Sequence, residues 1–260
     1  MLKELFSMQD KVCLVTGGSS GLGSYITRGF LEAGARRVYI TSRKTEACEA
    51  AAQELSQYGD CVALPGDMSL LEEIERIAAE LAEREDHLDV LVNNAGTAWA
   101  APLADYPEKG WDKVMDLNAK TPFFLTKALV GLLSKSASPE ATSSVINITS
   151  IAGSLPAGDE NYAYGASKAA LDHVTTSLAL RLARKNVRVN AIAPGRFYSK
   201  MTTYVSNDAD AIQKEFDVIP LQRWGGEGDI AGVAVMLASS AGAFITGEVI
   251  TVDGGFKLIA

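Results

Sequence analysis

Short apolar runs rich in β-branched residues alternate along the chain with longer segments in which apolar residues recur every three or four positions. The first pattern is typical of strands, and the second is typical of helices that bury one face. The short runs predict strands at residues 11–17, 37–42, 61–67, 88–96, 144–150, 187–195 and 248–255. The longer segments predict helices at residues 22–34, 45–59, 70–85, 110–135, from about 161 to about 184, and from about 227 to about 239.

Strands that alternate with helices predict an α/β fold, with a doubly wound, seven-stranded parallel sheet and helices on both faces. The strands are nearly continuous apolar runs, as expected when both faces of a sheet are covered. No linker, repeat or low-complexity run interrupts residues 1–260, so we expect a single domain. Ligands of such sheets bind beyond the carboxyl ends of the strands, where Gly17, Gly96, Ser150 and Gly195 should share one rim.

Composition and charge exclude several function classes. The net charge of −8 argues against nucleic-acid binding, which needs clustered Lys and Arg. No apolar run approaches the roughly 20 residues that span a bilayer, and the N-terminus does not resemble a signal peptide, so we expect a cytoplasmic protein without membrane contact. Three cysteines without CxxC spacing and only two histidines disfavour a disulfide framework, a metal site and a Ser-His-Asp hydrolase.

The stretch "TGGSSGLG" (16–23) connects the first strand to the first helix. Gly17, Gly21 and Gly23 would let the backbone turn tightly and approach a pyrophosphate, which the N–H groups at the helix start can bind. The spacing is Gly-x3-Gly-x-Gly rather than Gly-x-Gly-x2-Gly, and the Gly-Lys-Ser/Thr ending of a nucleotide-hydrolase loop is absent. A plain tight turn would also use these glycines, but their position after the first strand favours dinucleotide binding.

The end of the second strand indicates which dinucleotide binds. An NAD enzyme places Asp or Glu there to bond the ribose 2′-OH, whereas this chain has Thr41 and Ser42 followed by Arg43 and Lys44. An arginine can hold a 2′-phosphate by two charge-assisted bonds. We therefore predict NADP(H) with Arg43 as the main contact; the alternative is a solvated basic turn.

The stretch "YAYGASK" (162–168) carries a candidate acid-base pair. Tyr164 and Lys168 lie four residues apart and so share a helix face, whereas Tyr162 would pair only with Ala166. A cation within about 4–6 Å can lower a phenol's pKa by roughly 1–3 units, which would let Tyr164 pass a proton to a carbonyl oxygen. The spacing occurs often by chance and carries little weight alone.

Two further polar residues extend this candidate site. Ser150 ends the fifth strand 14 residues before Tyr164, where its hydroxyl could hold the same carbonyl oxygen. Its alternative role is to cap the next turn. Asn118, in "MDLNAK", interrupts an apolar helix and could hold a water that leads to Lys168, or could simply mark a bend in that helix.

These motifs together resemble the short-chain dehydrogenase/reductase family over essentially the full length of the chain. The stretches that carry the resemblance are "TGGSSGLG", "NNAG" (93–96), Asn118, "ITS" ending at Ser150, "YGASK", "APG" (193–195) and "TGEVITVDGG" (246–255). The resemblance implies a Rossmann-like fold and a catalytic tetrad of Asn118, Ser150, Tyr164 and Lys168, with Lys168 also bonding the nicotinamide ribose. It implies cofactor contacts from Gly17, Ser19, Ser20, Gly21, Leu22, Gly23, Arg43, Asp67, Met68, Asn94, Ala95, Gly96, Tyr164, Lys168, Pro194, Gly195, Phe197 and Ser199.

The resemblance gives several of these residues specific roles. It places Asp67 at the adenine, a backbone group of Phe197 and the hydroxyl of Ser199 at the carboxamide, and Asn93 in support of the central strand. The sequence departs from the family pattern at "GGEGD" (225–229), which replaces the usual Pro-Glu, and at Phe197, which is bulkier than the usual Ile or Val.

More narrowly, the chain resembles NADPH-dependent β-ketoacyl reductases of the type associated with rhamnolipid biosynthesis. The stretches concerned are "LEAGA", "YGDC", "NNAGTAW", "YAYGASKAAL", "IAPGRF" and "IPLQRWG". This resemblance implies reduction of 3-oxoacyl thioesters under a substrate lid at about 197–220. Trp99 is either an apolar wall or simple packing. Lys185 and Lys135 either dock acyl carrier protein or are solvated helix ends.

Other functions stay open. A general reductase of small or xenobiotic ketones or polyols would use the same site, and a non-catalytic NADP(H)-binding sensor or scaffold would use only its cofactor half. The family resemblance also implies a homotetramer, joined through helices near 118–134 and 164–184 and through the last strand.

Overall fold

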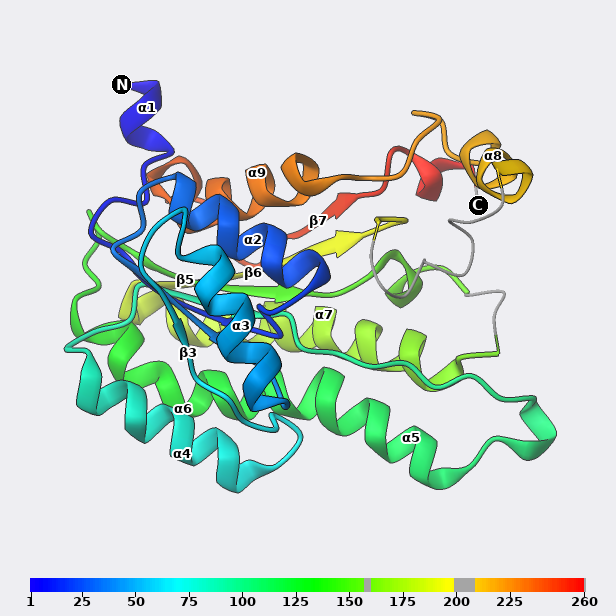
Figure 1. The fold of residues 1–260 in the computed structure, drawn as a ribbon, viewed down its shortest axis with the longest axis horizontal. Helices are drawn as coiled ribbons and strands as arrows, with labels where there is room; N and C mark the ends of the chain where they lie inside the picture. Colours follow the sequence, from blue (N-terminus) through cyan, green and yellow to red (C-terminus); the bar gives the residue numbers. More distant parts are fainter. Residues whose placement is uncertain (157–159, 199–208, 260) are drawn as a thin grey trace.

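The sheet is parallel throughout and follows the strand order β3-β2-β1-β4-β5-β6-β7 (Figure 1). The computed structural model describes residues 1–156, 160–198 and 209–259. The strands are β1 (Val12–Thr16), β2 (Arg37–Thr41), β3 (Cys61–Ala63), β4 (Val90–Asn93), β5 (Ser143–Ile148), β6 (Val187–Pro194) and β7 (Val249–Val252). The order reverses between β3-β2-β1 and β4-β5-β6-β7, so the crevice beyond β1 and β4 is where a ligand of such a fold binds. The predicted fold class is confirmed.

Helices cover both faces of the sheet (Figure 1). One face packs against α2 (Gly21–Glu32), α3 (Thr45–Leu55) and α9 (Glu227–Ala238), and the other against α4 (Leu71–Arg84), α6 (Thr121–Lys135) and α7 (Tyr162–Leu182). Successive side chains of a strand point to opposite faces, so Cys13 and Val15 enter the first core while Val12 and Leu14 enter the second. Two buried faces explain why the strands read as continuous apolar runs.

Shorter elements complete the described chain. They are α1 (Leu2–Leu5), α5 (Glu108–Met115) and α8 (Ala209–Asp217), a π-helical turn at Asp116–Lys120, and 3-10 turns at Leu103–Asp105, Ile151–Gly153, Ala183–Lys185, Ser240–Gly242 and Phe256–Leu258. None of the helices in the described ranges combines the length and apolar composition that crossing a bilayer requires.

The strands leave the sheet earlier than the pattern predicts. The third strand ends at Ala63 rather than at residue 67, and the fourth ends at Asn93 rather than at residue 96. Pro65 has no N–H to donate to a neighbouring strand, which limits the third strand. The residues released from the sheet, such as Asn94 and Gly96, form the loops of the carboxyl rim.

In two segments the helices of the structure differ from those that the sequence predicts. The single helix predicted at 110–135 consists of α5, the π-helical turn and α6, and Asn118 lies in that turn. The segment 197–220, predicted as a substrate lid, contains α8; its residues 199–208 lie outside the described chain.

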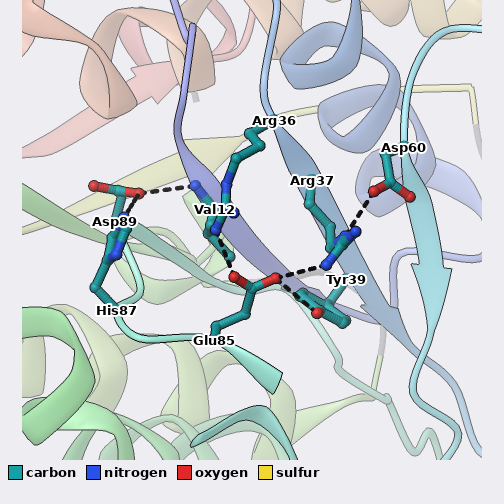
Figure 2. A network of polar contacts seen from close by, with 8 residues as sticks. All are labelled: Val12, Arg36, Arg37, Tyr39, Asp60, Glu85, His87 and Asp89. Carbon is teal, nitrogen blue, oxygen red and sulfur yellow. Dashed lines mark hydrogen bonds and ion pairs between the residues drawn. The ribbon is translucent and has the colours of Figure 1, made fainter. Parts of the chain in front are cut away.

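A buried carboxylate ties α4 to β2 at the opposite, amino end of the sheet (Figure 2). Glu85 accepts hydrogen bonds from Arg36, Arg37 and the Tyr39 hydroxyl. Its burial raises the pKa of Glu85, but the bonds from Tyr39 and the two arginines outweigh this effect, and the pKa lies below its ordinary value. The network joins the end of α4 to the start of β2, on the side of the sheet opposite the carboxyl rim.

Candidate active site

The loop between β1 and α2 has the geometry of a cradle for a phosphate group. Gly17 and Gly21 have φ of +65° and +57°, values that favour glycine. A Cβ on Gly23 would lie 2.4 Å from the Gly17 carbonyl oxygen, so only glycine fits there. Ser20 is the N-cap of α2, no described side chain caps this end, and the first turn holds no acidic residue. The N–H groups of the helix start are therefore available to an anion.

Asn94 fixes this loop against the end of β4. Its Nδ2 donates to the carbonyls of Thr16 at 2.8 Å and Gly17 at 3.2 Å. The Thr16 hydroxyl in turn accepts from the backbone N–H groups of Asn94 and Ala95 at 2.9 and 3.0 Å. These bonds place Asn94 and Ala95 beside the loop, whereas the sequence analysis did not single out Thr16.

Basic rather than acidic residues follow β2. Arg43 is exposed, and no described residue forms an ion pair with its guanidinium. Thr41 is fully buried, and its hydroxyl has no hydrogen-bond partner among the described residues. A carboxylate at either position would repel a 2′-phosphate, so the residues present fit NADP(H) rather than NAD(H).

The other residues predicted to contact the adenosine half of the cofactor differ in how far their side chains are exposed. Ser19 and Leu22 are partly exposed and Ser20 is exposed. The Asp67 carboxylate accepts hydrogen bonds from the N–H and the hydroxyl of Ser69 at 3.0 and 2.7 Å. The Met68 side chain is 3% exposed in the core, so any cofactor contact there comes from its backbone.

The Asn118 amide joins the loop after β4 to α7. Its Oδ1 accepts from the Thr97 N–H at 2.9 Å, and its Nδ2 donates to the Thr97 carbonyl at 2.9 Å and to the Ser167 hydroxyl at 3.0 Å. A π-helical turn interrupts the α-helix at this position, so Asn118 marks an irregularity of the helix, and such turns often occur at functional sites. The bonds to Thr97 and to Ser167 on α7 also make Asn118 a link between two parts of the rim.

Ser150 has the capping role that was its alternative interpretation, and it also contacts the predicted proton donor. It is the N-cap of the 3-10 turn Ile151–Gly153, and its hydroxyl accepts from the Ala152 N–H at 3.2 Å. The same hydroxyl also forms a hydrogen bond with the phenol of Tyr164, which helps to lower the pKa of that phenol. Serine at this point therefore connects the end of β5 to the start of α7.

Tyr164 and Lys168 share a face of α7, as their spacing predicts. The Lys168 Nζ lies 5.6 Å from the centroid of the Tyr164 ring and donates to the Ile148 carbonyl at 2.7 Å. Burial lowers the pKa of Lys168 to about 8, opposed by the negative charge of Asp172. The predicted lowering of the Tyr164 pKa by Lys168 is not found in this structure. Burial raises the pKa of Tyr164 above its ordinary value, and the bond from Ser150 offsets only part of the rise.

The candidate groups converge at Gly96. A Cβ on this glycine would lie 3.2 Å from Asn118 Oδ1 and 3.7 Å from Lys168 Nζ. The loop after β4, the π-helical turn and α7 therefore meet at one point, with Ser150 joined to Tyr164 beside it. No group of three or more His, Cys, Asp or Glu side chains in the described ranges could hold a metal ion.

The segment predicted to bind the carboxamide follows β6. Pro194 ends the strand, and a Cβ on Gly195 would lie 2.7 Å from the Asp253 side chain. Phe197 is 4% exposed, and its ring occupies space left by Gly225, where a Cβ would lie 2.4 Å from the ring. The bulk of Phe197 therefore points into the core. Ser199, predicted beside it, lies outside the described residues.

Buried amides support the site from within the sheet. Asn93 Nδ2 donates to Asn147 Oδ1, and Asn147 Nδ2 donates to the Thr175 hydroxyl, each at 2.8 Å. This chain of bonds connects β4, β5 and α7 and agrees with the predicted role of Asn93. Asn147 was missed, although an amide inside the apolar run "SVINITS" was a usable signal.

Comparison with known proteins supports the same identification. A family model described as enoyl-(acyl carrier protein) reductase matches residues 17–257. The chain is 49% identical, over 97% of its length and 98% of the relative's, to the rhamnolipids biosynthesis 3-oxoacyl-[acyl-carrier-protein] reductase of Pseudomonas aeruginosa. It is 33% identical, over 97% of its length and 93% of the relative's, to the short-chain dehydrogenase/reductase PhomF of Diaporthe leptostromiformis.

A solved structure has nearly the same fold. The Pseudomonas aeruginosa RhlG/NADP active-site complex superposes with a TM-score of 0.95 at 48% identity, and the match covers 98% of this chain and 99% of that one. The family inferred from the motifs is confirmed by sequence and by fold. The chain belongs to the short-chain dehydrogenase/reductase family.

Proposed function

We propose that the protein reduces the 3-oxo group of acyl thioesters to a 3-hydroxyl group, with NADPH as the hydride donor. The observation that carries the proposal is the meeting of Ser150, Tyr164 and Lys168 at the carboxyl rim, beside a loop that fits a dinucleotide. The choice of a 3-oxoacyl substrate rests on the 49% identical relative, which is a 3-oxoacyl-[acyl-carrier-protein] reductase.

Bound NADPH supplies the hydride that reaches the carbonyl carbon. The Ser150 hydroxyl holds the carbonyl oxygen, and Tyr164 gives that oxygen its phenolic proton. A raised pKa keeps Tyr164 protonated at neutral pH, which is the form that a proton donor needs. Lys168, whose pKa is about 8, is mainly an ammonium at pH 7 and stabilises the phenolate that remains. Asn118 would hold the water through which Tyr164 regains its proton.

Arg43 is the residue that we propose for cofactor choice. Its exposed guanidinium has no competing carboxylate among the described residues and can hold the 2′-phosphate that distinguishes NADPH from NADH. The RhlG relative forms a complex with NADP, which supports NADP(H) as the cofactor. Arg43→Ala should raise the Kd for NADPH about tenfold or more and leave the Kd for NADH unchanged, because a charge-assisted bond contributes about 1.5–3 kcal/mol. Equal effects on both cofactors would contradict the assignment.

Aromatic side chains next to the catalytic helix are proposed to line the acyl path. Tyr162 is 43% exposed, and its ring stands edge-on to Tyr106 with the centroids 5.5 Å apart. The Tyr106 hydroxyl donates to the Trp99 carbonyl at 3.0 Å and so holds this loop in place. The Trp99 ring packs against Gly110 and Lys113 of α5, which favours the packing interpretation for Trp99. Tyr162 and Tyr106 are therefore the better candidates for a wall.

Substrate profiling with NADPH tests the proposal. Acetoacetyl-CoA, longer 3-oxoacyl thioesters, simple ketones and keto-sugars should be compared, with thioesters giving the highest kcat/KM. Tyr164→Phe should lower kcat about 10²-fold or more, because the carbonyl oxygen loses its proton donor. Tyr162→Phe is the matched control and should keep most of the activity. A preference for simple ketones would favour a general carbonyl reductase, and tight NADPH binding without any turnover would favour a sensor.

The lysines considered for acyl carrier protein lie far from this site. Lys185 follows the last turn of α7, and at about 1.5 Å per residue it is about 30 Å along the helix from Tyr164. Lys135 ends α6 before β5 begins, at the same amino end of the sheet. This distance favours their interpretation as solvated helix ends. Comparing KM for coenzyme A and carrier-protein thioesters tests whether a carrier docks elsewhere.

We also propose the homotetramer of the family. Phe123, Ala128 and Gly131 on α6 and Ala166 and Leu180 on α7 are exposed small or apolar residues on the helices that would meet. Light scattering on the purified protein should give four times the 27.6 kDa of the chain, and a monomer would contradict the proposal.

A further inference from the structure

Asp172 is an acidic residue of α7 that the proposed reaction does not yet use. It lies four residues beyond Lys168, so the two side chains share a helix face. Its side chain is half-buried, and its Oδ1 is fully buried without a hydrogen-bond partner in the described chain. A buried carboxylate oxygen without a donor is unfavourable for the fold, so its presence calls for a reason other than stability.

The turn that carries Ser150 packs directly on this part of α7. A Cβ on Gly153, at the end of the turn, would lie 3.0 Å from Asp172 Oδ2 and 3.0 Å from backbone atoms of Lys168 and Ala169. Only glycine permits so close an approach. The carboxylate therefore lies between the catalytic helix and the turn that presents Ser150.

The charged and polar groups that face Asp172 come from three elements. Lys168 lies on α7 itself, Lys257 lies in the last 3-10 turn, and the Thr149 hydroxyl comes from the end of β5. Both charged neighbours are cations. Thr149 directly precedes Ser150, and its hydroxyl also lies 3.2 Å from the Ile192 carbonyl.

We infer that Asp172 is a positioning residue for the proposed reduction, which keeps Lys168 in its ammonium form and holds the Ser150 turn against α7. The inference rests on the proposed function, because it assigns Asp172 to the same site. It requires no contact between Asp172 and the substrate or cofactor: the carboxylate acts on Lys168 through its charge and on Ser150 through Thr149 and Gly153.

The titration of the two groups agrees with this arrangement. Burial lowers the pKa of Lys168 to about 8, and the charge of Asp172 is the influence that raises it. Burial raises the pKa of Asp172, while Thr149, Lys168 and Lys257 lower it. Without the carboxylate, the pKa of Lys168 must fall below about 8, so less of it is protonated at neutral pH.

Asp172→Asn tests the inference, because it keeps the shape and removes the charge. A loss of about 1 pKa unit at Lys168, the low end for a nearby opposite charge, should move the alkaline limb of kcat/KM about 1 unit toward lower pH. At pH 7.5 kcat/KM should then fall about threefold, while at pH 6 it should stay nearly unchanged. Asp172→Ser, also neutral, should behave alike and serves if the asparagine variant does not fold.

A second readout needs neither cofactor nor substrate. The folded pKa of Lys168 lies below its unfolded value, so the free energy of unfolding rises with pH above the folded pKa. In the parent protein this rise should start near pH 8, and in Asp172→Asn it should start about 1 unit lower. Urea denaturation of the protein alone, from pH 6 to pH 10, measures this shift.

Two further variants separate charge from structure. Glu83→Gln removes an exposed carboxylate from α4 and should move neither readout. Thr149→Val keeps the charge of Asp172 and should lower kcat without moving the alkaline limb. If Asp172→Asn and Asp172→Ser lose activity equally at all pH values, or retain the parent pH dependence of unfolding, the inference is wrong. If the parent protein reduces no carbonyl compound, the proposed function fails, whereas the unfolding measurement still decides the coupling of Asp172 to Lys168.

Discussion

Replacing Lys168 with methionine shows how strongly the fold opposes the charge of this side chain. Lys168 is 4% exposed, and burial lowers the pKa of its ammonium group from 10.5 to about 8. One pKa unit corresponds to about 1.4 kcal/mol, so holding Lys168 protonated at pH 7 lowers the free energy of unfolding by about 3 kcal/mol. Methionine has a similar length and no charge, and removes this penalty.

The effect of the substitution depends on pH in a defined direction. Between pH 8 and 10.5 the unfolded chain keeps a proton that the folded protein has released, so the parent protein gains stability as pH rises. The variant lacks this gain. The free energy of unfolding of Lys168→Met, minus that of the parent, should therefore fall by about 3 kcal/mol from pH 7 to pH 10.5. The Ile148 carbonyl loses its donor in the variant, which subtracts a constant amount of about 1–3 kcal/mol at every pH.

Urea denaturation followed by circular dichroism measures this difference at a fixed protein concentration, because assembly would otherwise change the apparent stability. Lys109→Met, at an exposed position of α5, is the control and should differ from the parent by the same amount at each pH. A constant difference between Lys168→Met and the parent from pH 7 to pH 10.5 would refute the reasoning. It would mean that the folded protein does not depress the pKa of Lys168.

Three other predictions concern packing, the sheet network and the substrate wall. Gly225→Ala should lower the free energy of unfolding by about 1–3 kcal/mol, because the new Cβ would collide with the Phe197 ring. In the double variant, Phe197→Val should restore most of this loss. Additive losses from the two substitutions would contradict the pairing. Glu85→Gln should be less stable than the parent by about 1–3 kcal/mol at pH 7. Urea denaturation should show this difference shrink as pH falls through the lowered pKa of Glu85. A difference that persists in acid would count against the network. Tyr162→Ala should raise KM about threefold or more for long 3-oxoacyl thioesters, because burial of each CH₂ of the acyl chain contributes about 0.8 kcal/mol. The KM for acetoacetyl-CoA should stay unchanged. An equal rise for both substrates would show that Tyr162 does not line the acyl path.

At the candidate site, the sequence pattern predicts some features of the structure and not others. Spacing alone put Tyr164 and Lys168 on one helix face, and the structure has them there. The same spacing put Asp172 on that face, but its importance could not be read from the sequence, because it depends on the close approach of Gly153 from a different element. Of the two roles considered for Ser150, the structure shows the cap, in which its hydroxyl accepts from Ala152, and adds a bond to Tyr164. Its hold on the carbonyl oxygen stays a prediction.

The departures from the family pattern also gained their meaning from packing. Phe197 and the glycines at 225–229 are far apart in the sequence and read as separate changes. In the fold they are neighbours: the Phe197 ring fills the space above Gly225, and α9 begins after Gly226 with Asp229 accepting from the Gly226 N–H at 2.7 Å. The replacement of Pro-Glu thus changes the start of a helix, as predicted.

The sequence by itself determined the alternation of strands and helices, the parallel sheet, the rim that carries the site, and the family. Hydrophobic periodicity and glycine-rich turns are local properties, so they can be recognised in a single segment without knowledge of the rest of the chain. The tertiary structure decided the early ends of β3 and β4, the π-helical turn at Asn118, the burial that shifts the pKa of Lys168, and the contact between Gly153 and Asp172. These features depend on which distant segments come into contact, and only packing sets how much water and how many partners each polar group keeps.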